Sequence, residues 1–230
     1  ANPEIVLATR AYGWFKENPN ELCDTVRHLT DDTLFQPGAD AIKFFFRRVG
    51  VISGFIVNAE KAKKLSSDLF DGRLYYQMYL AGMLMAEGQG YYFSDVMTLS
   101  RDTEAPDFGN AGTEKGVFTP GGYKPEGRIH MVEGLLLIAK YIEDTTKIDG
   151  VYAGIRKDLA NYFYPYIRDQ LDLPLYTYIK MINKFREMGF SNEKLFYVHA
   201  FLGYVLKRRG YDALIKYIRS KKGGTPRLGI

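Results

Sequence analysis

The sequence predicts a mixed α/β fold that continues into an all-helical bundle at the C-terminal end. Up to residue 101, short apolar runs rich in β-branched residues alternate with segments whose apolar residues recur at helical spacing. From residue 126 onward, five segments show helical spacing alone. The stretch Asp102–Pro125 between them is rich in Gly and Pro and shows neither period. We therefore divide the chain into an α/β part, residues 1–123, and a helical part, residues 124–230.

The α/β part is expected to begin with a buried strand. The predicted elements, in order, are strand Glu4–Thr9, helix Ala39–Arg48, strand Val49–Val57, helix Ala59–Ser66, helix Arg73–Glu87 and strands Tyr91–Phe93 and Val96–Ser100. Asn58 is expected to cap the second helix, and Gly88 to end the third. Tyr12–Pro37 is predicted to be polar loop, so the first strand has no obvious partner near it.

The helical part is expected to hold about five helices. They are predicted at Glu126–Thr145, Val151–Gln170, Leu175–Met188, Asn192–Lys207 and Tyr211–Ser220. Pro165 lies inside the second of them, where a proline kinks or splits a helix.

Composition narrows the function classes. The chain has 230 residues, 46% of them hydrophobic, which is enough to bury a core. One cysteine and three scattered histidines form neither an internal disulfide nor a zinc motif. No apolar run approaches the roughly 20 residues of a membrane helix, and the first residues lack a signal-peptide pattern. The expected location is the cytoplasm, with peripheral contact at the inner membrane face.

Positive charge is concentrated at the C-terminal end. Residues 203–230 contain eight Lys and Arg against the single acid Asp212. Such a run is typical of a solvated helix face. It also suits a surface that binds anionic lipid or nucleic acid.

Four short sequence motifs carry a resemblance to a known family. They are Val49-Gly50-Val51-Ile52-Ser53-Gly54-Phe55-Ile56-Val57-Asn58, Ala59-Glu60-Lys61, Asp71-Gly72-Arg73-Leu74-Tyr75-Tyr76-Gln77 and Gly88-Gln89-Gly90-Tyr91-Tyr92. In this order they resemble the acceptor-side half of a family 2 glycosyltransferase of the GT-A type. The resemblance covers roughly residues 1–101 and is strongest from Val49 to Arg101.

The resemblance implies a sugar transferase of cell-surface polysaccharide biosynthesis. It implies a nucleotide-sugar donor, a saccharide or lipid-linked saccharide acceptor and inversion at the anomeric carbon. A divalent cation, Mg or Mn, is implied as cofactor. The family holds it with an Asp-x-Asp motif, which is absent from this sequence. Asp102-Thr103-Glu104 is the nearest approximation, but it follows the matched strands, so no metal ligand is assigned. We therefore expect the second part of a longer enzyme, inactive alone.

The resemblance also suggests site residues. Asp71 is the acid nearest to the position of the family's catalytic base, although Asp71-Gly72 is also an ordinary turn. The usual Glu-Asp pair there is replaced by Gly72-Arg73. Ser53 and Gly54 interrupt an apolar strand, which marks either close approach of a ligand or a bulge.

Four further residues are expected to bind substrate. Tyr75 and Gln77, at a helix N-terminus, offer stacking and hydrogen bonds to a sugar ring. Arg101 and Asp102 end the last strand, where ligands of open α/β sheets collect, and a surface ion pair is the alternative role for Arg101. The stretch Asp102–Pro125 is either a segment that closes over the donor or a linker.

Two other functions stay open. One is a non-enzymatic helical interaction module that binds membrane or nucleic acid through the basic C-terminus. The other, a different nucleotide-binding enzyme, is weakened because the sequence contains neither Gly-x-Gly-x-x-Gly nor a phosphate loop. For the glycosyltransferase no nucleic-acid partner is expected.

Overall fold

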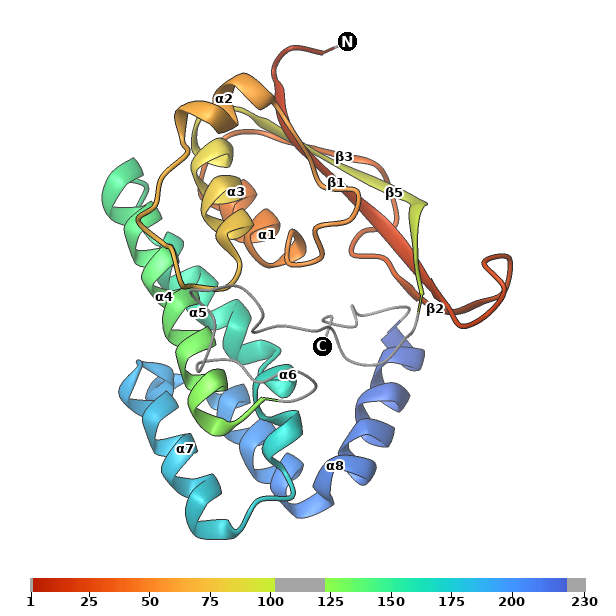
Figure 1. Ribbon diagram of the computed structural model, residues 1–230, viewed down its shortest axis with the longest axis vertical. Coiled ribbons are helices and arrows are strands. Elements are labelled where there is room, and N and C mark those ends of the chain that lie inside the picture. The colour runs from red at the N-terminus through yellow and green to blue at the C-terminus, as the bar shows by residue number, and fades with distance from the viewer. Residues whose placement is uncertain (1, 102–122, 223–230) are drawn as a thin grey trace.

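The computed structural model describes residues 2–101 and 123–222. Figure 1 shows a curled sheet with helices against one face and a second group of helices below them. The predicted mixed α/β class is confirmed.

Among the described residues, the sheet has five strands of mixed direction. They are β1 (Ile5–Phe15), β2 (Leu22–Val26), β3 (Thr33–Phe35), β4 (Ile56–Val57) and β5 (Gln89–Arg101). The strand order is β2-β1-β5-β3, and β4 pairs with the start of β1. The long strands β1 and β5 are parallel, whereas β2, β3 and β4 pair antiparallel with their neighbours.

The first strand is longer and better paired than the sequence indicates. The predicted strand Glu4–Thr9 continues to Phe15, so the predicted loop Tyr12–Pro37 is wrong. Asn18 makes a hairpin turn instead, in which its Oδ1 accepts the Asn20 N–H and its carbonyl accepts the Glu21 N–H. The turn returns the chain into β2, which gives β1 the partner that the sequence left unassigned.

The predicted strand Val49–Val57 is also wrong for most of its length. Val49 is the C-cap of the preceding helix, and its N–H bonds to the carbonyl of Phe45. The backbone then turns at Gly54, which has φ +75°, a conformation that suits glycine. Only Ile56–Val57 remains extended. The two strands predicted over Tyr91–Ser100 form one strand, β5, whose register against β1 shifts between Phe93 and Val96.

Three helices are described in the α/β part: α1 (Ala39–Arg48), α2 (Ala59–Lys64) and α3 (Tyr76–Glu87). α1 packs on α3, which contacts β1, whereas α2 buries none of its residues. α1 has the predicted bounds, and Asn58 caps α2 by accepting the Lys61 N–H at 3.1 Å. α3 begins three residues later than predicted because Tyr75 has φ +71° and cannot be helical. Gly88 ends α3, as predicted.

The helical part contains five α-helices among the described residues. They are α4 (Pro125–Thr146), α5 (Val151–Asn161), α6 (Tyr164–Ile167), α7 (Leu175–Glu187) and α8 (Lys194–Lys222). Pro165 lies in the first turn of α6 and separates it from α5, so the predicted break is confirmed. The last two predicted helices are joined in α8, which is interrupted at Lys207, where φ is +57° and ψ is +175°.

One hydrophobic core joins the two parts of the chain. It runs from Val6 in β1 to Ile215 in α8. α3 packs on α4 so closely that a Cβ on Gly82 would lie 2.2 Å from Ile142 Cδ1. The predicted boundary near residue 123 adjoins residues outside the described ranges. Within those ranges, no helix is long and apolar enough to cross a membrane.

Candidate functional site

A buried arginine lies at the centre of the sheet. Arg10 of β1 is only 2% exposed, and its Nε donates to Thr98 Oγ1 of β5 at 3.1 Å. The guanidinium lies 4.8 Å from the ring centre of Tyr12. Neither Nη atom has a hydrogen-bond acceptor within the described part of the chain. Burial lowers the pKa of Arg10, because a charge without a carboxylate partner is costly away from water.

Two more arginines approach the same region from α1. The ring of His28 packs edge-on against the rings of Phe44 and Tyr92, and the backbone N–H of His28 donates to the Tyr92 hydroxyl at 2.8 Å. The pKa of His28 is held well below its ordinary value, first by burial and then by the charges of Arg48, Arg47 and Arg10. We call Arg10, Arg47 and Arg48 the arginine cluster.

One carboxylate offsets part of this charge. Asp158 of α5 accepts from Arg47 Nε at 2.7 Å and lies 3.4 Å from Arg48 Nη1. Within the described residues it is the only carboxylate that pairs with the cluster. With His28 neutral, three guanidinium groups and one carboxylate leave an excess of two positive charges. A region of this kind attracts anions.

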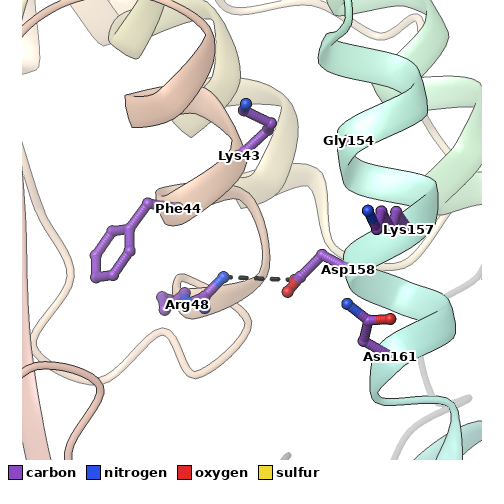
Figure 2. A pocket seen from close by; sticks show the side chains of 7 residues that line it. All are labelled: Lys43, Phe44, Arg48, Gly154, Lys157, Asp158 and Asn161. Atoms are coloured by element: carbon purple, nitrogen blue, oxygen red, sulfur yellow. Dashed lines mark hydrogen bonds and ion pairs between the residues drawn. The ribbon is translucent and has the colours of Figure 1, made fainter. Parts of the chain in front are cut away.

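A pocket of about 350 Å³ opens beside the cluster, between α1 and α5. Its lining residues are Lys43, Phe44, Arg48, Gly154, Lys157, Asp158 and Asn161. Figure 2 shows Lys43, Phe44 and Arg48 on one helix, opposite Lys157, Asp158 and Asn161 on the other. Lys157 adds to the positive charge of Arg48, whereas Lys43 is paired with Asp40 at 2.7 Å. The volume lies in the range of small-ligand sites, and the charge suits a phosphate group.

Two of the predicted substrate residues, Gly54 and Gln77, contact the sheet near Arg10 or the loop that rests on it. A Cβ built on Gly54 would lie 2.3 Å from Arg10 Nε and 2.4 Å from Thr98 Oγ1, so the turn rests directly on the sheet. Gln77 of α3 reaches the same loop, because its Nε2 lies 3.4 Å from the carbonyl of Gly50. Ser53 is exposed beside Gly54.

The other predicted site residues lie elsewhere. Asp71 is exposed in a turn closed by its own N–H to the carbonyl of Asp68. Tyr75 faces the helical part, where burial raises the pKa of its hydroxyl and the nearby Arg128 opposes the rise. Arg101 is exposed at the end of β5 and donates from Nε to the carbonyl of Lys16 at 3.1 Å. Asp102, like most of the stretch Asp102–Pro125, is outside the described residues.

The described residues offer no assembled metal site. No three His, Cys, Asp or Glu side chains gather there in a way that would hold a metal ion. A divalent cation therefore has no ligands to which this part of the chain can be matched.

Sequence reasoning missed the arginine cluster. A signal was present, because Arg10 interrupts an apolar strand, and Arg47 and Arg48 follow the apolar run Phe44–Phe46. Charged residues are almost never fully buried unless they are paired, so an arginine in a buried strand indicates a special role. Asp158 had no comparable signal, since it lies 111 residues from Arg47 in sequence.

The comparisons with known proteins find no match to this chain among protein-family models, curated proteins or solved structures. The fold and the site by themselves define a mixed α/β protein with a pocket between α1 and α5 that is lined by Arg48, two lysines and Asp158.

Proposed function

We propose that this chain carries the acceptor-side half of a GT-A-like glycosyltransferase. The enzyme transfers a sugar from a nucleotide-sugar donor to a saccharide or lipid-linked saccharide acceptor. The observation that supports this most is the contact of Gly54 with Arg10 and Thr98. This contact places the turn at Ser53-Gly54 on the parallel strands β1 and β5, beside Arg10 of the arginine cluster. The turn belongs to one of the four sequence motifs that carry the family resemblance.

The charge of the cluster suits such a donor. A nucleotide-sugar contains a pyrophosphate, and the nucleoside diphosphate that leaves carries further negative charge as the glycosidic bond breaks. Guanidinium groups bind phosphate oxygens through charge-assisted, often bidentate hydrogen bonds. Arg48 and Lys157, which line the pocket, would stabilise that developing charge.

The reaction we propose is a single in-line displacement. The acceptor hydroxyl gives its proton to a carboxylate base, its oxygen bonds to the anomeric carbon, and the nucleoside diphosphate leaves with the electron pair of the broken bond. The family resemblance makes Asp71 the candidate base; it is exposed, and it does not line the pocket between α1 and α5. The divalent cation that the resemblance implies stays part of the proposal, and no residue of this chain is assigned to hold it.

Binding of nucleoside diphosphates tests the proposal. Isothermal titration of UDP, GDP, CDP and dTDP into the full-length gene product should find one that binds. Arg48→Gln should weaken that binding about tenfold or more, the usual cost of losing a hydrogen bond to a charged group. Arg186→Gln is the matched control, because Arg186 lies on α7 and contacts Asn183. The absence of any binding, or equal effects of the two variants, would contradict the proposal.

A further inference from the structure

The first half of α8 exposes a row of large apolar side chains. Leu195, Val198, Phe201 and Val205 are 45%, 45%, 67% and 59% exposed. Their spacing of three or four residues places them along one face of the helix. We call these four residues the α8 stripe.

The opposite face of the same segment is already used for packing. Phe196, Ala200 and Gly203 are buried there. Tyr178 of α7 donates to the carbonyl of Ala200 at 2.8 Å and stacks on Tyr204. The α8 stripe is therefore a second apolar face of this helix segment, and it does not pack in the hydrophobic core.

Exposed cations adjoin the stripe in the sequence. Lys194 precedes it, and Arg208 and Arg209 follow it just beyond the kink at Lys207. Residues 194–209 contain no Asp or Glu. Lys207 differs from these three, because its Nζ contacts the carbonyl of Leu171 at 3.2 Å and lies over the ring of Tyr204.

We propose that the α8 stripe binds the surface of a membrane that contains anionic lipids. Apolar side chains of an interfacial helix enter the boundary between headgroups and acyl chains, while flanking cations meet lipid phosphates. The α8 stripe and its three exposed cations supply both kinds of contact. The proposal goes beyond the transfer reaction and does not depend on it.

The charges argue against two other occupants. If a second copy packed on the same stripe, either helix orientation would bring cations from one copy close to cations of the other, with no acid in the segment to offset them. A nucleic acid would pair with the cations, but its phosphate backbone gives Phe201 and Val205 no apolar surface to enter.

Vesicle cosedimentation of the full-length protein tests the proposal. We expect binding to vesicles of phosphatidylcholine with phosphatidylglycerol, and much weaker binding to phosphatidylcholine alone. Phe201→Ser should weaken binding about tenfold, since it removes one large inserted side chain. The double variant Arg208→Gln/Arg209→Gln should weaken it about 30-fold at low salt, at the usual contribution of a basic residue near an anionic surface.

The matched control is Met97→Ser. Met97 is a large apolar side chain, 60% exposed, but it lies on β5 rather than on α8, so its replacement should leave vesicle binding unchanged. The proposal is overturned if Phe201→Ser binds vesicles as tightly as the parent protein does. It is equally overturned if light scattering finds a dimer that Phe201→Ser dissociates while vesicles are not bound.

Discussion

Gly54 lies against Arg10, with no room between them for even one additional carbon atom: a Cβ on Gly54 would come within 2.3 Å of Arg10 Nε. The turn that holds Gly54 therefore covers the buried guanidinium and helps to fix its position. Gly54 in the α1–β4 connection and Arg10 in the middle of β1 therefore restrict each other's position. The local backbone adds a second requirement, because Gly54 has φ +75°.

Comparing a Gly54 variant with a Gly150 variant separates the effect of the close contact with Arg10 from the effect of the positive φ. Gly54→Ala should lower the free energy of unfolding by about 2–4 kcal/mol, from left-handed backbone strain together with overpacking against Arg10 and Thr98. Gly150→Ala is the matched control, since Gly150 has φ +80° but nothing within 4 Å of its Cβ position. It should cost only about 1–2 kcal/mol. Urea denaturation measures both, and equal losses would show that Gly54 does not press on Arg10.

Asp158 should be important for stability. Asp158→Asn removes the carboxylate that pairs with Arg47 and Arg48 and leaves a buried cation uncompensated. We expect a loss of about 3 kcal/mol in the free energy of unfolding. Asp144→Asn, which breaks an exposed pair with Lys140, should cost less than about 1 kcal/mol. A loss for Asp158→Asn as small as that of the control would refute the burial argument.

The depressed pKa of His28 makes stability depend on pH. In the unfolded chain a histidine titrates near 6.5, whereas burial and the arginine cluster keep His28 neutral in the folded protein well below that pH. The unfolded state therefore takes up a proton first, and stability is lost as pH falls below 6.5, by at most about 1.4 kcal/mol per pH unit.

The variant His28→Gln isolates this effect. The pKa of His199 is also lowered by burial, and that residue contributes equally to both proteins. The parent protein should lose stability faster than His28→Gln between pH 7 and pH 5, a window set by the ordinary pKa of histidine. Parallel stability curves, or a ring resonance of folded His28 that titrates near pH 6.5, would be inconsistent with a buried neutral histidine.

Asp71 should affect turnover rather than donor binding. If it takes the proton of the acceptor hydroxyl, Asp71→Asn should lower kcat by about 10²–10⁴ and leave nucleoside diphosphate affinity unchanged. Asp68→Asn is the control, because Asp68 is exposed in the same turn. Equal turnover of the two variants would exclude Asp71 as the base.

Local signals in the sequence predicted local structure well. The bounds of α1, the Asn58 cap and the break at Pro165 follow from short-range chemistry, and the structure confirms them. The predicted strand Val49–Val57 failed because β-branched residues also serve as a helix C-cap and in turns. The hydrogen bond from the Val49 N–H and the positive φ of Gly54 decide between these states.

Contacts between residues that are far apart in the sequence could not be predicted from it. The parallel alignment of β1 with β5 joins residues more than eighty positions apart, and so does the contact of Arg10 with Thr98. Asp158 meets Arg47 only because α5 packs on α1. Such contacts depend on the whole topology, and periodicity within a window of the sequence does not contain them.

Nucleotide-sugar consumption tests the central claim most directly. The full-length gene product would be incubated with a panel of nucleotide-sugars, with and without a saccharide-lipid extract, and released nucleoside diphosphate would be measured. We predict that one donor is consumed, that the extract accelerates its consumption, and that Arg48→Gln slows it while Arg186→Gln does not. If no donor is consumed, or if Arg48→Gln is as active as the parent protein, the glycosyltransferase account of the pocket between α1 and α5 is contradicted.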